Sequence, residues 1–135
     1  MELNIRQITE SDWETLMSWW EAWPEWVVPV KDSLPDNGTG GFIVESNNKP
    51  VAACFLYFTN SKIGWIEWTI SDPEYRGKDR NKAIEHLIST SELVLKEKGF
   101  KYAFSICRNK NLINKFKKLG WSVSNDHSFE AVKLL

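Results

Sequence analysis

The N-terminal part of the chain pairs a short strand pattern with a helix that is rich in tryptophan. Leu3, Ile5 and Ile8 are separated by polar residues, which predicts a first strand. Two overlapping capping-box patterns follow at Thr9–Asp12 and Ser11–Glu14, and they predict a helix that begins near residue 10. One face of this helix carries apolar side chains at the spacing of a buried helix: Trp13, Leu16, Met17 and Trp20.

A second apolar stripe on the same segment consists of tryptophans alone. Trp19, Trp23 and Trp26 follow a helical spacing, although Pro24 is expected to end the helix between the last two. One small helix cannot easily bury two apolar faces, and large exposed aromatic side chains usually have a partner. Two interpretations of the stripe therefore stand: it is additional core, or it lines a pocket or an interface.

The middle of the chain predicts an antiparallel meander. Residues 27–40 contain two prolines and two glycines, which favours irregular chain or a short helix. Three apolar runs follow over residues 41–45, 51–58 and 63–71, and short polar turns separate them. Such turns join neighbouring antiparallel strands.

The C-terminal half begins with a long helical pattern over residues 80–98, which Gly99 ends. A buried strand at Tyr102–Cys107 and a helix over residues 111–119 come next. A strand, helix and strand of this length normally form a right-handed crossover, so the strands at 63–71 and 102–107 are predicted to be parallel neighbours.

Two further strands are predicted at the end of the chain, at Trp121–Val123 and Phe129–Leu134, on either side of a polar turn at Ser124–Ser128. The whole pattern describes a single α+β domain over residues 1–135, with a mixed, mostly antiparallel sheet and helices on both of its faces. The chain shows neither an internal repeat nor a low-complexity linker.

Composition and charge argue against several classes of protein. The apolar runs are too short to span a bilayer and the N-terminus lacks the profile of a secretory signal, so a cytoplasmic protein is expected. Cys54 and Cys107 are far apart inside apolar runs, and the two histidines are isolated, so neither a disulfide nor a metal site is expected. A pI near 6.1 without a sustained basic stripe argues against a nucleic-acid partner.

The net charge of −1 conceals a division along the chain. Residues 1–75 carry 4 Lys or Arg against 12 Asp or Glu, whereas residues 76–135 carry 13 against 6. The two parts could simply neutralise each other in the fold. Alternatively, the basic part binds an anionic ligand and the acidic part a cationic one.

The segment from 70 to 82 is the strongest candidate for an anion site. An apolar strand breaks at Pro73 and runs through a basic loop into the helix that begins near residue 80. Such a loop directs backbone N–H groups and the positive end of a helix dipole at one point, which suits a phosphate or pyrophosphate. A solvated helix start without a ligand is the alternative.

With this segment and a second one, Asn109–Trp121, the chain resembles the GNAT family of acyl-CoA-dependent N-acetyltransferases over essentially its whole length. The family's loop, Gln/Arg-x-x-Gly-x-Gly/Ala, wraps the pyrophosphate of coenzyme A, and here Arg76 opens it while Asp79 and Asn81 replace its two glycines. Asp79 is suited to turn outward and cap the following helix. The family's second element ends Leu-Tyr-Glu-Lys-Leu-Gly-Phe, so Phe116 stands where a tyrosine is usual.

The resemblance implies that the donor is acetyl-CoA. It implies a donor site formed by the end of the fourth strand, the loop, and the asparagine that follows the fifth strand and would contact the pantetheine arm. The residues of this expected donor site are Ile70, Ser71, Arg76, Gly77, Lys78, Asp79, Arg80, Asn81, Lys82 and Asn109.

The same resemblance implies a set of catalytic positions. The family's tyrosine protonates the leaving thiolate, which Phe116 cannot do, and backbone near Ile70 and Ser71 would face the developing oxyanion. Asn109 could equally be a turn residue or a helix cap. The expected catalytic set is Glu67, Ser71, Asn109 and Phe116.

Glu67 is the candidate general base. Strict alternation along the fourth strand places it with Thr69 and Ser71, opposite Ile66, Trp68 and Ile70. A lone acid in an apolar strand is expected to have a raised pKa, as a base that deprotonates an amine requires. A structural ion pair is the alternative.

The sequence thus predicts an N-acetyltransferase that moves acetyl from acetyl-CoA to a primary amine, without a covalent intermediate. The acceptor is expected to be a cationic small molecule or a protein amine bound by Trp19, Trp23, Trp26 and Glu67, and the protein a monomer or homodimer. The alternative is a catalytically silent module of the same fold that senses acyl-CoA or binds a protein. Asp79, Asn81 and Phe116 favour that alternative.

Overall fold

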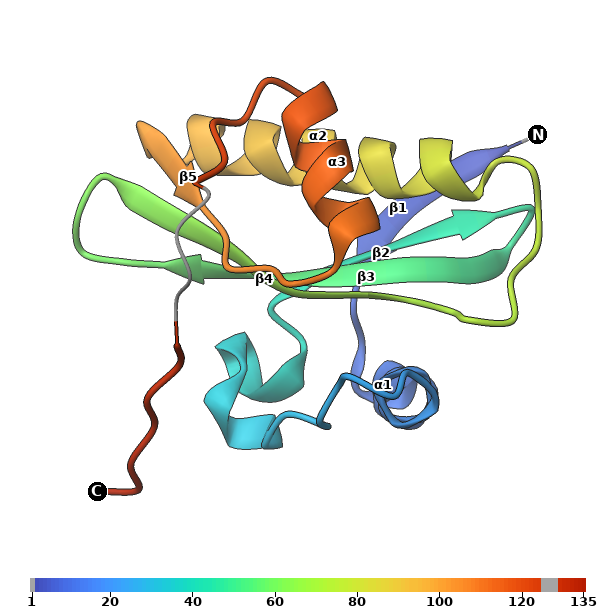
Figure 1. Ribbon diagram of the computed structural model, residues 1–135, viewed down its shortest axis with the longest axis horizontal. Coiled ribbons are helices and arrows are strands. Elements are labelled where there is room, and N and C mark those ends of the chain that lie inside the picture. Colours follow the sequence, from blue (N-terminus) through green and yellow to red (C-terminus); the bar gives the residue numbers. More distant parts are fainter. Residues whose placement is uncertain (1, 125–128) are drawn as a thin grey trace.

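A five-stranded sheet forms the centre of the protein (Figure 1). The computed structural model describes residues 2–124 and 129–135. The strands lie in chain order across the sheet, and all neighbours are antiparallel except β4 and β5, which are parallel. The strands are β1 (Leu3–Gln7), β2 (Gly41–Ser46), β3 (Lys49–Phe58), β4 (Ile63–Ser71) and β5 (Tyr102–Phe104). The predicted mixed sheet with a parallel final pair is confirmed.

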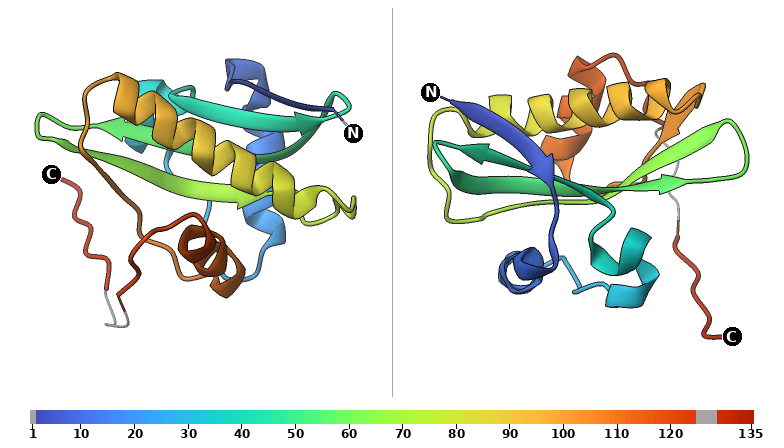
Figure 2. Two further views of the ribbon diagram at one scale, coloured as in Figure 1. Left: turned by 90° about the horizontal axis from the view of Figure 1, so that it is seen from above. Right: turned by 180° about the vertical axis from the view of Figure 1, so that it is seen from behind.

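Helices cover both faces of the sheet, as predicted (Figures 1 and 2). Helix α1 (Trp13–Ala22) lies on one face, while α2 (Arg80–Glu97) and α3 (Lys110–Lys118) lie on the other. Three short 3-10 helices belong to the segments around α1 and after it: η1 (Glu10–Asp12), η2 (Lys31–Ser33) and η3 (Pro35–Gly38).

Each face of the sheet has its own apolar core. The α2 face buries side chains from the middle strands and from α2 and α3, including Leu56, Ile66 and Leu87. The α1 face buries Trp20 and Phe55, whose rings stack with centroids 6.2 Å apart. Burial of this apolar area on both faces is the main stabilising term of the fold.

A β-bulge in β4 breaks the alternation that the sequence predicts. Trp68 has a φ of 56°, and the pairing of β3 with β4 shifts register between Ala53 and Phe55. As a result Ile66 packs on the α2 face, whereas Trp68 and Ile70 pack on the α1 face. The prediction that these three side chains share one side is therefore wrong, because a bulge inserts an extra residue into the strand.

Strand β5 is shorter and less buried than predicted. It pairs with β4 only through Tyr102, Ala103 and Phe104, and two of these side chains are exposed. The predicted buried strand to Cys107 is wrong. Beyond Trp65, the backbone amide of Ile106 donates instead to the Glu67 carboxylate at 2.6 Å.

The last two predicted strands do not form among the described residues. Trp121 packs its ring on Phe116, with centroids 4.4 Å apart, and its Nε1 donates to Glu92 at 3.2 Å, so this segment folds back on α2 and α3. Residues 129–135 are exposed and extend away from the sheet (Figure 1). Residues 125–128 of the predicted turn lie outside the described part of the chain.

Within the described residues, none of the helices combines the length and the apolar character needed to cross a bilayer.

Candidate active site

Hydrogen bonds of the Asp79 side chain fix the loop between β4 and α2. This side chain is only 7% exposed and accepts hydrogen bonds from the hydroxyl of Ser46 and, at 2.6 Å, from the hydroxyl of Tyr75. These two bonds lower the pKa of Asp79. A Cβ at Gly77 would lie 2.5 Å from the Tyr75 hydroxyl oxygen, so a larger residue there would displace the bonded Tyr75 and Asp79 side chains. Asp79 stands at the N-cap position of α2, but its side chain turns inward and makes no cap hydrogen bond, so the expectation that it turns outward to cap the helix is wrong.

The N-terminus of α2 has no side-chain cap. The backbone N–H of Arg80 donates to Gly77 at 3.2 Å, but the second and third residues of the helix, Asn81 and Lys82, have no intrahelical acceptor for theirs. Arg76, Lys78 and Lys82 are exposed around this end. Uncapped N–H groups, the helix dipole and exposed cations together form a site for an anion.

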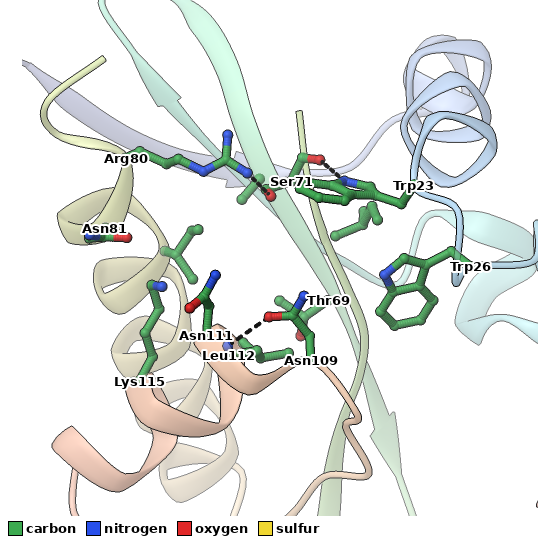
Figure 3. Close-up of a pocket in the computed structure, with 13 residues that line it drawn as sticks. Trp23, Trp26, Thr69, Ser71, Arg80, Asn81, Asn109, Asn111, Leu112 and Lys115 are labelled. Carbon is green, nitrogen blue, oxygen red and sulfur yellow. Dashed lines mark hydrogen bonds between the residues drawn. The ribbon is translucent and has the colours of Figure 1, made fainter. Parts of the chain in front are cut away.

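Arg80 points inward rather than to solvent (Figure 3). Its guanidinium donates to the carbonyls of Asp72, at 2.6 Å, and Tyr75, at 2.9 Å, and to the Ser71 hydroxyl at 2.6 Å. It also lies over the ring of Trp23, 6.0 Å from the centroid. Partial burial lowers the pKa of Arg80. Arg80 therefore fixes the loop to the end of β4.

A first cavity of about 130 Å³ opens between β4, α2 and α3 (Figure 3). Arg80 and Lys115 contribute positive charge, and none of the described residues that line it carries a carboxylate. Burial lowers the pKa of Lys115. The lining residues are Trp23, Trp26, Ala52, Thr69, Ile70, Ser71, Arg80, Asn81, Ile84, Asn109, Asn111, Leu112 and Lys115.

Polar groups at the end of β4 and the start of α3 form the walls of this first cavity. The indole Nε1 of Trp23 donates to the Ser71 carbonyl at 2.8 Å. Asn109 is the N-cap of α3, and its side-chain oxygen accepts from the amide of Leu112 at 3.1 Å. Asn109 thus has the capping role, and its side chain also lines the cavity.

A second cavity of about 220 Å³ adjoins the first and has the opposite charge. It contains three carboxylates, of which Glu130 pairs with Arg108 at 3.3 Å, and two indole rings that tilt at 44° to each other. Both cavities are lined by Trp26 and Asn109. The lining residues are Glu25, Trp26, Glu67, Trp68, Ile106, Cys107, Arg108, Asn109 and Glu130.

Glu67 lines this second cavity. Burial raises the pKa of its carboxyl to about 7, and the hydrogen bond from the Ile106 amide offsets only part of that effect. A carboxylate with such a pKa can take a proton near neutral pH. The arrangement therefore places a group with a pKa near neutral pH in a cavity that adjoins the positively charged first cavity.

The sequence profile of the Acetyltransferase (GNAT) family matches residues 5–121. The chain belongs to the GNAT acetyltransferase family. No curated protein sequence matches the chain.

Solved structures show the same fold. Ard1 from Thermoplasma volcanium superposes with a TM-score of 0.74 at 15% identity, covering 92% of this chain and 85% of its own. A transcriptional regulator from Bacillus halodurans C-125 reaches 0.70 at 14% identity, covering 97% of this chain and all of its own. The aminoglycoside N-acetyltransferase AAC(6')-Iy in complex with CoA reaches 0.64 at 18% identity, covering 98% and 96%. At these identities the likeness concerns the fold alone.

The structure brings some of the residues expected from the sequence to the two adjoining cavities, but not all. Trp23 and Trp26 line the cavities, whereas Trp19 is 5% exposed and packs in the α1-face core. Phe116 is 2% exposed and packs against Trp121, and it lines neither of the two cavities. Trp19 is therefore additional core, whereas Trp23 and Trp26 line a pocket.

Several lining residues have no counterpart in the sequence prediction. Asn111 and Lys115 are four residues apart on α3, so the helical period could have placed them on one face with Leu112. Glu25 and Glu130 come together only through the tertiary fold. Thr69 is visible in the strand pattern, but nothing in the sequence shows that its hydroxyl is unpaired.

Proposed function

We propose that this GNAT member is an N-acetyltransferase that moves an acetyl group from acetyl-CoA to a primary amine by direct attack. The observation that carries the proposal is the contact between two cavities of opposite charge. The first has cations and no carboxylate among its described lining residues, the second has three carboxylates, and Trp26 and Asn109 line both. An anionic donor and a cationic acceptor would meet at that wall.

The donor site would combine the loop, the first turn of α2 and the first cavity. The uncapped N–H groups of Asn81 and Lys82 suit the pyrophosphate, with Arg76, Lys78 and Lys82 as surrounding cations. A third cavity, of about 330 Å³, lies between α2 and α3, where Lys118 pairs with Glu85 at 2.7 Å and Lys115 is the cation left among the described lining residues to attract the remaining anionic part of coenzyme A. The inward turn of Asp79 supports this assignment, because it removes that carboxylate from the anion site.

Glu67 would act as the general base. An acceptor amine arrives protonated, and a carboxylate with a pKa near 7 can accept its proton at neutral pH. The free amine nitrogen then attacks the thioester carbon, the carbonyl electron pair moves onto oxygen, and the collapse of this oxyanion releases the thiolate. Backbone near Ile70 and Ser71 remains the proposed position for stabilising the oxyanion.

The leaving thiolate has no tyrosine to protonate it, because Phe116 is buried against Trp121. General-acid help is worth roughly 10²- to 10⁴-fold, but a thiol with a pKa near 8.5 can leave as an anion. We therefore expect transfer to proceed with a reduced rate rather than to fail.

The second cavity favours a cationic acceptor, either a small molecule or a protein amine. Carboxylates attract an ammonium group, and the faces of Trp26 and Trp68 can add cation–π attraction. One of the similar structures is an aminoglycoside N-acetyltransferase, which is consistent with an acceptor of this kind.

Phe116 also favours a second candidate, a module that binds acyl-CoA without transferring the acyl group. Its buried ring supplies no proton donor to the cavity. In that case acetyl-CoA would raise the melting temperature, but none of a broad set of amines would increase thiol release.

The test measures melting temperature with coenzyme A and thiol release from acetyl-CoA with a panel of amines, for the wild type and Glu67→Gln. A ligand at a hundred times its Kd should add about 2.7 kcal/mol to the free energy of unfolding. Transfer that depends on Glu67 supports the enzyme. If excess coenzyme A leaves the melting temperature unchanged, both candidates are wrong.

A further inference from the structure

Two buried polar side-chain atoms have no hydrogen-bond partner among the described residues: Nε1 of Trp20 and Oγ1 of Thr69. Trp20 is fully buried in the α1-face core and lines neither the first nor the second cavity. Thr69 is 9% exposed and lines the first cavity. A buried hydroxyl without a partner destabilises a protein, so its presence in a cavity wall points to a partner that arrives with a ligand.

The position of Thr69 agrees with that interpretation. It directly follows Trp68, whose φ of 56° marks the bulge where the regular pairing of β4 is interrupted. Thr69 and Asn109 both line the first cavity (Figure 3), and Asn109 also lines the second. Glu67, the proposed base, is two residues before it in β4. The hydroxyl therefore lies on the donor side, near the wall where the two substrates would meet.

The cavity also lacks the hydroxyl that a tyrosine would supply, since Phe116 packs against Trp121 outside its lining. We propose that the Thr69 hydroxyl donates a hydrogen bond to the carbonyl oxygen of the bound thioester and stabilises the oxyanion that forms there. This inference rests on the proposed function.

The step balances without any further reagent. Glu67 takes one proton from the ammonium group, and the freed amine nitrogen forms a bond to the carbonyl carbon while the C=O electron pair moves onto the oxygen that Thr69 contacts. The second proton of that nitrogen passes to solvent water. The pair on the oxyanion then re-forms the C=O bond as the C–S bond breaks, and the thiolate takes the C–S electron pair. Nothing is oxidised or reduced. A donor fixed in a water-poor cavity acts on the developing charge without reorganisation, which makes such a bond effective.

Thr69→Val removes the hydroxyl and keeps a similar shape, and it separates this proposal from a structural role. Because the hydroxyl is unpaired in the free protein, the melting temperature should stay the same or rise. Ser46→Ala is the matched control: the buried Ser46 hydroxyl donates to the buried carboxylate of Asp79, so its removal should lower the melting temperature. A fall for Thr69→Val equal to that of Ser46→Ala would overturn the proposal.

The second readout compares coenzyme A with acetonyl-CoA, a stable analogue that keeps the carbonyl and cannot transfer its acyl group. Wild-type protein should gain more thermal stability from acetonyl-CoA than from coenzyme A. Thr69→Val should lose that difference, and Thr69→Ser should keep it. Equal behaviour of the valine variant and the wild type would overturn the proposal, whether or not an acceptor is known.

With an amine that the wild type accepts, Thr69→Val should lower kcat roughly 10²-fold, in the range for loss of one oxyanion donor, and leave the KM of the amine unchanged. Thr69→Ser should recover most of the rate. Wild-type rates in the valine variant would refute the role of Thr69 alone. A wild type that binds neither ligand would refute the proposed function, and the melting temperature of the free variant would still report whether the hydroxyl is paired.

Discussion

Glu67 shows how one residue can combine structural and chemical roles. One of its carboxylate oxygens accepts the Ile106 amide where regular β4–β5 pairing has ended, and burial raises the pKa of the group to about 7. The hydrogen bond links the ends of the two strands, and the raised pKa suits the carboxylate to its proposed role as the base. Substitution of Glu67 should therefore affect activity and stability in ways that pH can separate.

The activity of the wild type should rise with pH through about 7, because only the deprotonated Glu67 can accept a proton. Glu67→Gln should lower kcat roughly 10²- to 10⁴-fold and remove this step from the pH profile of kcat. Rate measurements at saturating amine from pH 5.5 to 8.5 provide the check. A glutamine variant with an unchanged profile would exclude Glu67 as the base.

The stability of the protein should show the opposite trend. The pKa of Glu67 is higher in the folded state than its usual 4.5, so the folded state holds this proton more tightly. The contribution of Glu67 to the free energy of unfolding therefore falls as the pH rises from about 4.5 to about 7. The Glu67→Gln variant should lack that fall. Melting temperatures of both proteins across this range test the sign, and identical curves would contradict the raised pKa.

Asp79 stands where the family loop has a glycine. The hydrogen bonds of its side chain predict how Asp79→Gly would change stability and coenzyme A binding. Because Asp79 accepts hydrogen bonds from Ser46 and Tyr75, Asp79→Gly should lower the melting temperature and loosen the loop rather than improve coenzyme A binding. Differential scanning fluorimetry measures the melting temperature, and a coenzyme A titration measures the affinity. Tighter binding at unchanged stability would mean that the carboxylate faces the anion after all.

At the scale of elements, helices and the meander could be predicted because their patterns are local. The period of α2 and the capping pattern around Asn109 lie within a few residues of sequence. The bulge at Trp68 could not be predicted, since its left-handed φ is sterically unfavourable for a large side chain and persists only through packing on both faces. The short β5 and the irregular course of Trp121–Val123 likewise depend on tertiary contacts of Glu67 and Trp121.

Patterns within a short stretch of sequence also decide which residues of the site could be predicted. The loop before α2 and Glu67 are visible in a short window of residues, whereas the second cavity joins Glu25, Glu67 and Glu130 from distant segments. The inward direction of Asp79 depends on Ser46 in β2, which is 33 residues away. No pattern within the loop itself indicates that contact.

The uncapped N-terminus of α2 is the proposed binding site for the pyrophosphate of coenzyme A, and its charge can be tested. Lys82→Glu places a negative charge beside free N–H groups and should weaken coenzyme A binding roughly 5- to 30-fold at low salt, and less as salt rises. Lys101→Glu makes the same charge change at an exposed position that lines none of the three cavities, and it should bind like the wild type. Isothermal titration calorimetry at two salt concentrations measures the coenzyme A affinity of both variants. Equal losses of affinity would mean that the anion does not bind at the N-terminus of α2.

At the scale of the whole molecule, the division of charge along the sequence becomes a division between two cavities. Arg80 and Lys115, from the basic part of the chain, lie in the first cavity, and Glu25 and Glu67, from the acidic part, lie in the second. Glu130 is an exception, since it comes from the basic part and pairs with Arg108. The charges therefore do more than neutralise each other across the fold, because they give the proposed donor and acceptor sites opposite potentials.

This division predicts how the acceptor site responds to charge. Glu25→Gln removes an exposed carboxylate from the second cavity and should lower kcat/KM for a diamine roughly two- to fivefold at low salt, with a smaller effect on a monoamine of equal length. The second ammonium of the diamine is the group that loses its partner, while Glu67 still receives the reacting one. Physiological salt should reduce the difference between wild type and variant, because exposed charges are screened.

Glu21→Gln is the matched control, because Glu21 is exposed in the last turn of α1 and does not line the cavity. It makes the same change in net charge, so a general electrostatic effect would lower kcat/KM equally in both variants. Steady-state rates with the two amines at two salt concentrations separate a local effect from a general one. If Glu25→Gln treats monoamine and diamine alike, the second cavity does not select for a second charge, and the acceptor is recognised by its reacting amine alone.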